Sequence, residues 1–336
     1  MTKVGIIGAG SWGIALASLL YHQGNEVVVW SAVGEEIEAL DQTRRLRTLP
    51  DLMLPESMLF TKDLEQAMAG KDFLVMSVPS IYVRQTAARM RAFCKRGQLL
   101  VNVAKGIEDS TLMTLSSVIG QELPMADVAV LSGPSHAEEV SRGLPTTCVA
   151  GAKSRKVAEY IQEQFMSPVF RVYTSPDILG IEVGGALKNV IALAAGIADG
   201  LGYGDNTKAA LITRGIYEIT RLGLAMGGRP STFSGLSGIG DLIVTCASMH
   251  SRNRQAGILI GRGYSMQAAM DEVKMVVEGV YSAKAGLALA EKYHVPVPII
   301  REVNRVLFEG KEPKTAVNDL MLRHKTEEST EADWDH

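Results

Sequence analysis

The sequence is poor in cysteine and aromatic residues, and its charges nearly cancel. Its three cysteines, Cys94, Cys148 and Cys246, are too few and too scattered for a disulfide framework or a zinc site built on paired cysteines. We therefore expect a reducing compartment and no metal site. Aromatic residues make up only 6% of the chain, so aliphatic residues and methionine must fill the core. The 34 basic and 37 acidic residues leave a net charge of −3, which argues against a nucleic-acid partner.

Long hydrophobic runs are also missing. Residues 1–10 hold a short apolar stretch broken by glycine, without the longer apolar region and cleavage site of a signal peptide. The most apolar later stretch, residues 190–198, contains Gly196 and is followed by Asp199 and Gly200. It is too short to cross a bilayer. We expect a soluble, cytoplasmic protein without membrane insertion.

What is present is the composition of a globular protein of two domains. The chain has 336 residues, 46% of them hydrophobic, and 33 glycines against 12 prolines. In the first half, near-continuous apolar runs alternate with helix-like segments, which is typical of a parallel sheet covered on both faces. The predicted strands are residues 3–7, 26–30, 73–78, 98–104, 128–131, 147–150 and 170–173, and the predicted helices 11–22, 81–94, 110–119 and 154–165.

After about residue 174 the pattern becomes helical. The predicted helices are residues 178–198, 207–222, 252–261, 265–270, 282–292 and 299–307. The sequence thus predicts an α/β protein with a doubly wound sheet domain at residues 1–178 and an all-helical domain at residues 179–324. Residues 325–336 are polar and mostly acidic, and we expect a flexible tail.

The first strand is followed by a glycine motif that is typical of dinucleotide binding. Gly8, Gly10 and Gly13 have the spacing G-x-G-x-x-G, after a predicted strand and at the start of a predicted helix. Gly8 permits the tight turn, Gly10 lets the backbone approach a pyrophosphate, and Gly13 permits close packing of helix on sheet. The alternative is a purely structural turn. The context favours a Rossmann-like, cofactor-binding domain.

The residues that would choose between NADH and NADPH are ambiguous. An acidic residue after the second strand favours NADH and a basic one NADPH, but residues 29–33 carry no charge. Glu35 and Glu36 come slightly late and fit a solvated helix. Three arginines follow within reach of a phosphate, or form only a surface cluster: Arg44, Arg45 and Arg47.

Two segments bring polar residues to the ends of later strands. Lys105 follows the strand at residues 98–104, and ligands bind at the carboxyl ends of such strands. The alternative is an ordinary loop lysine. Ser132–Ser135 carries glycine and hydroxyl groups that suit a polar substrate, but Ser135 and Glu138 have the spacing of a capping box, which we favour here.

Two segments of the helical half combine glycine with charge. Lys188 and Asn189 lie in an otherwise apolar helix, where desolvation would bring the lysine pKa into a useful range, unless the side chain snorkels to solvent. Asp241 and Thr245 share a helix face if the run is helical, and Asp241 alone would suit a helix cap.

A phosphate site is suggested at residues 251–253. Ser251, Arg252 and Asn253 supply a hydroxyl, a guanidinium and an amide at a predicted helix start, although a capped, solvated helix start is the alternative. Cys246 has no catalytic partner and suits a small core position.

Together these motifs resemble the bacterial NAD(P)-dependent glycerol-3-phosphate dehydrogenases. The resemblance covers roughly residues 3–322. It rests on GAGSWG (8–13), AKG (104–106), SGPS (132–135), GGALKNV (184–190), GDLIVTC (240–246), SRNR (251–254) and VVEG (276–279). The family interconverts dihydroxyacetone phosphate and sn-glycerol 3-phosphate with NADH or NADPH and feeds glycerophospholipid synthesis. The resemblance also implies a homodimer.

The resemblance implies roles for individual residues. Lys188 would be the catalytic acid and base, with Lys105 and Asp241 beside it. The substrate would be held by Lys105, Gly133, Ser135, Lys188, Asn189, Asp241, Thr245, Ser251, Arg252 and Asn253. The cofactor would be bound by Gly8, Gly10, Ser11, Trp12, Gly13, Lys105, Ala137, Arg252, Val276 and Glu278. Ala32, Val33 and Thr48 depart from the family pattern on the cofactor side.

Two other functions are weighed against this one. A two-domain dehydrogenase of β-hydroxy acids would share the fold and a catalytic lysine but has less need of a phosphate site. A nucleotide-binding protein without catalysis would not need Lys105, Lys188 and Asp241.

Overall fold

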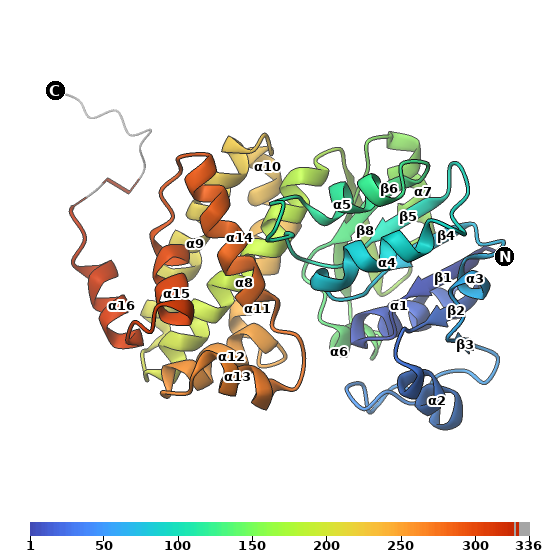
Figure 1. The fold of residues 1–336 in the computed structure, drawn as a ribbon, viewed down its shortest axis with the longest axis horizontal. Helices are drawn as coiled ribbons and strands as arrows, with labels where there is room; N and C mark the ends of the chain where they lie inside the picture. Colours follow the sequence, from blue (N-terminus) through green and yellow to red (C-terminus); the bar gives the residue numbers. More distant parts are fainter. Residues whose placement is uncertain (326, 329–336) are drawn as a thin grey trace.

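The chain begins with a sheet covered by helices and ends in a helical bundle (Figure 1). The structure is a computed structural model and describes residues 1–325, 327 and 328. Of the tail expected at residues 325–336, all but residues 325, 327 and 328 lie outside the described residues.

One eight-stranded sheet forms the first half, in the order β3-β2-β1-β4-β5-β6-β7-β8. The neighbouring strands are parallel except for β6 and β7, which pair antiparallel. The expected sheet is thus confirmed as parallel-dominated, but not as wholly parallel. The strands are β1 (Lys3–Ile7), β2 (Glu26–Trp30), β3 (Leu59–Thr61), β4 (Phe73–Met76), β5 (Leu99–Asn102), β6 (Asp127–Ser132), β7 (Thr146–Gly151) and β8 (Phe170–Ser175).

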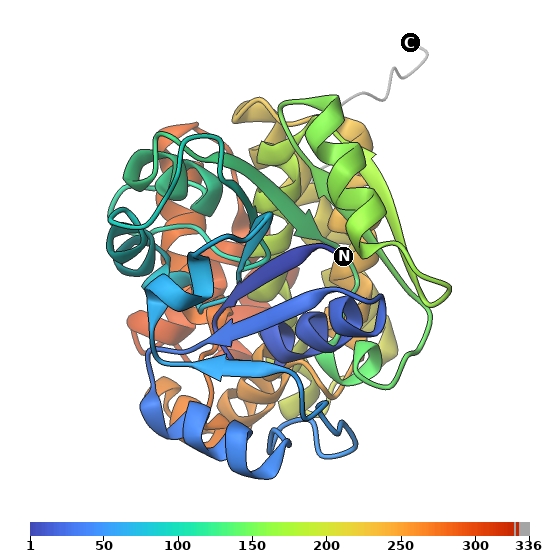
Figure 2. The ribbon, with the colours of Figure 1, turned by 90° about the vertical axis from the view of Figure 1, so that its right-hand side faces the viewer.

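Helices cover both faces of the sheet, which explains why its strands are nearly continuous apolar runs. Side chains of α1 and α7 pack on one face, and those of α3, α4 and α5 on the other. Figure 2 shows helices on both sides of the sheet. The helices are α1 (Ser11–His22), α2 (Gly34–Thr43), α3 (Leu64–Met68), α4 (Val83–Met90), α5 (Leu115–Glu122), α6 (Ala137–Val140) and α7 (Arg155–Phe165), with a 3-10 turn at Ser80–Tyr82.

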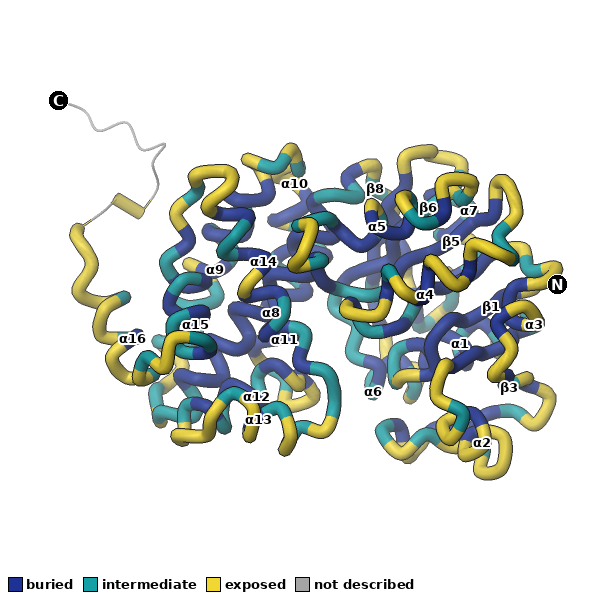
Figure 3. Tube along the Cα trace, in the orientation of Figure 1, coloured by how far each residue is buried: buried dark blue, intermediate teal, exposed yellow. Residues whose placement is uncertain are grey.

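The second half is built around α8 (Ile178–Gly200), which other helices surround. They are α9 (Asp205–Ala225), α10 (Pro230–Phe233), α11 (Asp241–Ala247), α12 (Arg252–Gly261), α13 (Met266–Val273), α14 (Glu278–Lys292), α15 (Pro298–Phe308) and α16 (Pro313–Met321), with a π-helical turn at Leu236–Gly240. Figure 3 shows buried positions along nearly all of α8. Cys246 is fully buried in this core, as expected.

Glycine lets α8 and α12 pack backbone against backbone. A Cβ on Gly196 would lie 2.2 Å from the carbonyl oxygen of Arg254, and one on Gly257 would lie 2.3 Å from that of Leu193. This contact fixes α12 against the C-terminal part of α8. By length and composition α8 is long and apolar enough to cross a membrane, contrary to the sequence expectation, but 89% of its apolar window is buried inside the protein.

Candidate active site

The glycine turn after β1 has room for a phosphate group. Gly8 has φ +121°, and a Cβ there would lie 2.8 Å from the backbone of Ser77. A Cβ on Gly13 would lie 2.1 Å from the carbonyl oxygen of Gly8, which explains the need for glycine where α1 packs on the turn. At Gly10, the residue before α1, a Cβ would meet nothing within 4 Å. The open space faces the free amides of a helix N-terminus, which fits a pyrophosphate.

Side chains of the glycine motif and of two other segments pack around this turn. Ser11 Oγ and Thr48 Oγ1 are hydrogen-bonded at 2.7 Å, so the loop after α2 lies against the start of α1. Trp12 is half-buried and packs on the sheet core, and Ala137 is buried at the start of α6, which contacts α1. Thr48, one of the departures from the family pattern, is therefore in contact with the glycine motif.

Three charged side chains from three elements meet between the sheet and the helical half. Lys105 follows β5, Lys188 lies in the middle of α8, and Asp241 is the first residue of α11. Lys105 Nζ donates hydrogen bonds to the carbonyl oxygen of Gly133 at 2.9 Å and to Asp241 Oδ2 at 2.6 Å. Lys188 Nζ donates to Asp241 Oδ1 and, at 2.7 Å, to Oγ1 of Thr245. One carboxylate thus joins two lysines from the two halves of the chain.

Burial controls the protonation of this group. Lys188 is 6% exposed and Asp241 is 1% exposed, so the interpretation of Lys188 as a snorkelling residue is wrong. Burial lowers the pKa of Lys188 to about 7, because the Asp241 carboxylate offsets only part of the desolvation and Lys105 lowers the pKa further. Burial alone raises the pKa of Asp241, but the charges of Lys105 and Lys188 outweigh it and hold this pKa below its ordinary value. A lysine that is half protonated near neutral pH suits proton transfer in both directions.

A π-helical turn delivers Asp241 to the two lysines. The turn Leu236–Gly240 leads directly into α11, and α11 starts at Asp241 without a side-chain cap. The interpretation of Asp241 as a helix cap is therefore wrong. Asp241 and Thr245 lie on one face of α11, as expected, and both contact Lys188. A Cβ on Gly184 would lie 2.6 Å from the carbonyl oxygen of Ser237, so α8 also touches the π-helical turn. Such turns recur at functional sites.

The asparagines of the two later motifs are paired in the interior. Asn253 Nδ2 donates to Asn189 Oδ1 at 2.9 Å, and the Gly279 amide donates to Asn253 Oδ1 at 2.8 Å. Ser251 caps α12 by accepting from the Arg254 amide, so the capped helix start is confirmed for this residue. Arg252 is exposed beside it, and its guanidinium donates to the carbonyl oxygen of Val276 at 3.3 Å. The start of α12 therefore adjoins Asn189, which is the neighbour of Lys188 in α8.

The segment after β6 does not form the capping box that its sequence favoured. Ser135 Oγ donates to the carbonyl oxygen of Gly133 at 2.9 Å, and α6 begins after His136, without a side-chain cap. The predicted capping box of Ser135 and Glu138 is therefore wrong. Because Gly133 also accepts from Lys105, Ser135 lies beside the lysine.

His136 is a site residue that the sequence analysis missed. Its Nε2 is 3.4 Å from the carbonyl oxygen of Val244, and its ring centroid is 6.0 Å from that of His250. Burial, and then the charge of Lys188, lower the pKa of His136. Its position directly after SGPS was the one available signal.

Two carboxylates, the buried Glu182 and the half-buried Glu278, connect the halves of the chain around this site, and both contacts were missed. Glu278 accepts hydrogen bonds from the amide, at 3.0 Å, and the hydroxyl of Ser80. Glu182 accepts from Asn102 Nδ2 at 3.3 Å, and from the amide and hydroxyl of Ser116 at 2.8 and 2.5 Å. Burial raises the pKa of both carboxyls.

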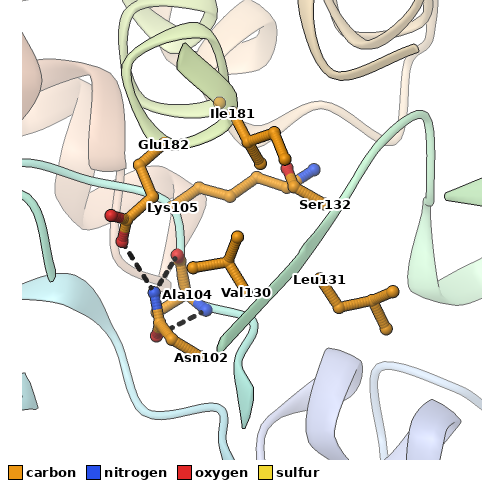
Figure 4. A pocket seen from close by; sticks show the side chains of 9 residues that line it. Asn102, Ala104, Lys105, Val130, Leu131, Ser132, Ile181 and Glu182 are labelled. Carbon is orange, nitrogen blue, oxygen red and sulfur yellow. Dashed lines mark hydrogen bonds between the residues drawn. The ribbon is translucent and has the colours of Figure 1, made fainter. Parts of the chain in front are cut away.

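Glu182 also shapes the loop that carries Lys105. Asn102 accepts from the Ala104 amide and donates to the Ala104 carbonyl oxygen, both at 3.2 Å, and Figure 4 shows this pair beneath Glu182. Glu182, Lys105 and Ser132 line a cavity of about 10 Å³, about the size of one water molecule. The buried Ser132 hydroxyl has no hydrogen-bond partner among the described residues.

The comparisons with known proteins agree over nearly the whole chain. Two family models, described as the N-terminus and the C-terminus of NAD-dependent glycerol-3-phosphate dehydrogenase, match residues 3–158 and 177–318. The glycerol-3-phosphate dehydrogenase (NAD(P)+) of Agathobacter rectalis is 62% identical, over 99% of this chain and 100% of that one. The protein of the same name from Bacillus subtilis is 50% identical, over 98% and 96%.

Solved structures give the same result. The crystal structure of glycerol-3-phosphate dehydrogenase from Coxiella burnetii has a TM-score of 0.91 at 34% identity and covers 96% of this chain and 99% of that one. D-mandelate dehydrogenase, at 13% identity and a TM-score of 0.65, shares the fold alone. The chain belongs to the NAD-dependent glycerol-3-phosphate dehydrogenase family.

Proposed function

We propose that the protein is an oxidoreductase that interconverts dihydroxyacetone phosphate and sn-glycerol 3-phosphate with NADH or NADPH, in support of glycerophospholipid synthesis. The observation that carries this proposal is the ion-paired group of Lys105, Asp241 and Lys188, which the two halves of the chain assemble together. A dehydrogenase of a phosphorylated ketone needs a proton carrier of this kind beside a phosphate site.

Lys188 carries the proton. The nicotinamide, when bound, supplies hydride chemistry at the central carbon of the substrate. During reduction, negative charge develops on the substrate oxygen, and the Lys188 ammonium stabilises this charge and donates its proton. In the oxidation direction, neutral Lys188 accepts the proton. A pKa of about 7 permits both roles near neutral pH.

Asp241 and Lys105 keep Lys188 in place. Asp241 accepts hydrogen bonds from both lysines, so it fixes the Lys188 ammonium relative to the end of β5. Thr245 supports the same ammonium from the next turn of α11. Asn189, Gly133 and Ser135 lie around this group and complete the proposed surface for the polar end of the substrate.

The start of α12 holds the phosphate. The free backbone amides of a helix N-terminus and the exposed guanidinium of Arg252 suit a dianion, and Ser251 and Asn253 flank them. Anchoring the phosphate uses the binding energy of a non-reacting group to align the carbonyl.

The cofactor lies along the glycine turn. Gly8, Gly10 and Gly13 form the turn, and Ser11, Trp12 and Ala137 stand beside it. On the helical half, Arg252, Val276 and Glu278 complete the proposed cofactor surface, with Lys105 between cofactor and substrate.

We further propose that residues 1–178 form the cofactor domain and residues 179–324 the substrate domain, and that the protein is a cytoplasmic homodimer. The last strand, β8, ends at Ser175 and α8 begins at Ile178, which supports this division.

The function is tested by following the oxidation of each reduced cofactor with dihydroxyacetone phosphate and identifying the product. We expect sn-glycerol 3-phosphate, and a much lower kcat/KM with unphosphorylated dihydroxyacetone. Equal rates with the two ketones, or turnover only with a β-hydroxy acid, would contradict the proposal.

A further inference from the structure

The sequence left the choice between NADH and NADPH open, and the structure supplies a new observation at the end of β2. This position reads the adenosine ribose in dinucleotide-binding sheets. Ser31 follows β2 directly, and its Oγ donates a hydrogen bond to Glu36 Oε2 at 2.7 Å. The Val33 amide donates to the same Ser31 Oγ at 3.1 Å. Glu36 lies several residues beyond β2, in the first turn of α2, but its side chain reaches back to the end of β2.

The Glu36 carboxylate is available to a ligand. Glu36 is exposed, and among the described residues it forms no ion pair. Two cations lie near this end of β2, and both have other partners: Lys62 Nζ is bound to Glu38 Oε1 at 2.7 Å, and the Arg89 guanidinium lies over the Trp30 ring, 5.2 Å from its centroid. Lys62 lies close to the start of α2, since a Cβ on Gly34 would be 3.1 Å from its Cδ. The Glu36 carboxylate is therefore an exposed negative charge at the end of β2 that neither cation pairs with.

Two of the three arginines that would favour a 2′-phosphate, Arg44 and Arg45, already have hydrogen-bond partners in the protein. Arg44 is bound to Asp41 at 2.9 Å and to the carbonyl oxygen of Met58 at 2.8 Å. Arg45 donates to the carbonyl oxygen of Pro50 at 2.8 Å. Arg47 is exposed, and the described residues provide it with no hydrogen-bond partner. Arg47 precedes Thr48, which contacts Ser11 in the glycine motif. Of the three arginines, Arg47 is therefore the one that could bind the 2′-phosphate of NADPH.

We propose that Glu36 makes this enzyme selective for NADH. Its carboxylate accepts hydrogen bonds from the ribose hydroxyls of NADH and repels the 2′-phosphate of NADPH. The inference rests on the proposed function, because it presumes that a dinucleotide binds along the glycine turn. It goes beyond that function because it selects one of the two cofactors and assigns the selection to one side chain.

Equilibrium binding tests the inference without relying on turnover. The dissociation constants of NADH and NADPH are measured by nucleotide fluorescence for the wild type, Glu36→Gln and the matched control Glu35→Gln. Glu35 is an exposed neighbour in the same helical turn, and the structure shows no hydrogen bond between it and Ser31. Adenosine 2′,5′-bisphosphate and AMP, added as competitors, isolate the contribution of the 2′-phosphate.

The wild type is expected to bind NADH about tenfold or more tightly than NADPH, the effect of placing a phosphate near one unpaired carboxylate. Glu36→Gln is expected to reduce this ratio at least threefold by strengthening NADPH binding, while Glu35→Gln changes it less than twofold. Adenosine 2′,5′-bisphosphate is expected to gain affinity in Glu36→Gln, and AMP is not.

Three results would overturn the inference. The first is equal or tighter binding of NADPH by the wild type. The second is an equal change of the ratio in Glu35→Gln and Glu36→Gln, which would show a diffuse field rather than a specific contact. The third is a loss of NADPH affinity in Arg47→Ala with no effect of Glu36→Gln, which would make Arg47 the selecting residue. A folded protein that binds neither cofactor would instead contradict the proposed function.

Discussion

Lys105 and Asp241 are separated by more than a hundred residues, yet Lys105 Nζ and Asp241 Oδ2 are 2.6 Å apart. Lys105 belongs to the sheet half and Asp241 to the helical half, so this contact exists only when the two halves are correctly placed. Asp241 also binds Lys188. The chemistry that we propose is therefore a property of the assembled protein.

The pH dependence of kcat/KM is expected to have opposite signs in the two directions. Reduction needs protonated Lys188, so its kcat/KM falls as the pH rises through about 7, whereas oxidation needs the neutral amine and its kcat/KM rises through the same pH. The substrate phosphate titrates near pH 6 and affects both directions alike. The check is a pair of pH profiles between pH 6 and 9. Limbs of the same sign above pH 7 would rule out Lys188 as the titrating acid and base.

Arg252→Ala is expected to weaken the phosphorylated substrate. Loss of a charge-assisted contact of about 1.5–3 kcal/mol corresponds to a rise in KM of roughly 10- to 150-fold. Arg262→Ala is the matched control, because it removes the same charge from an exposed position at the other end of α12. The measurement compares KM for dihydroxyacetone phosphate with KM for dihydroxyacetone. A parallel loss with both substrates would exclude a phosphate-anchoring role.

Gly10→Ala and Gly13→Ala are expected to fail in different ways. A Cβ at Gly10 meets nothing and its φ of −67° suits alanine, so this variant should fold normally and lose cofactor affinity, because the methyl group occupies the space for the pyrophosphate. A Cβ at Gly13 collides with the Gly8 carbonyl oxygen and should cost about 1–3 kcal/mol of unfolding free energy. Thermal unfolding and NADH titration separate the two effects. Undiminished NADH affinity in folded Gly10→Ala would contradict the proposal that the glycine turn binds the pyrophosphate.

Glu182→Gln is expected to lower both stability and kcat. The change disturbs hydrogen bonds of a buried carboxylate that joins α8 to Asn102 and Ser116, with a cost of about 1–3 kcal/mol. Because Asn102 also shapes the loop before Lys105, kcat should fall while NADH affinity stays close to normal.

Glu218→Gln serves as the control for Glu182→Gln. Glu218 is also a buried carboxylate that accepts backbone amides, from Ile299 and Ile300, but it lies outside the proposed site. It should change the unfolding midpoint without changing kcat. If the two variants lowered kcat by the same factor, Glu182 would have no special link to the site.

Local patterns predicted the first βαβ unit well, and they failed where structure depends on distant contacts. Residues 3–7, 11–22 and 26–30 were predicted with the observed bounds, because a glycine turn and strong periodicity define them. β3, α2 and α3 were missed. β3 and α3 have only three and five residues, and α2 carries few apolar positions. The antiparallel pairing of β7 leaves no local signal, because strand direction depends on the path of the chain.

In the candidate site, too, local patterns identified residues but did not predict the contacts between distant ones. Lys188 stood out because a lysine inside an apolar helix is unusual, and Asp241 stood out beside glycines. Their contact through a π-helical turn was not predictable from the spacing of the residues. The contacts of Glu182 and Glu278 were missed because each partner lies in the other half of the chain, where only the tertiary fold brings it close. Glu36 is an exposed helix residue, as expected, but its hydrogen bond to Ser31 was not predicted.

The role of Lys188 is tested most directly by the turnover of Lys188→Met with dihydroxyacetone phosphate and saturating reduced cofactor. Methionine fills the buried space without a titratable group, and general acid–base catalysis contributes roughly 10²- to 10⁴-fold. We predict a fall in kcat of that size, with nearly unchanged NADH affinity and with normal kcat in the control Lys153→Met, which removes an exposed lysine. Near-normal turnover by folded Lys188→Met would contradict the proposal that Lys188 carries the proton.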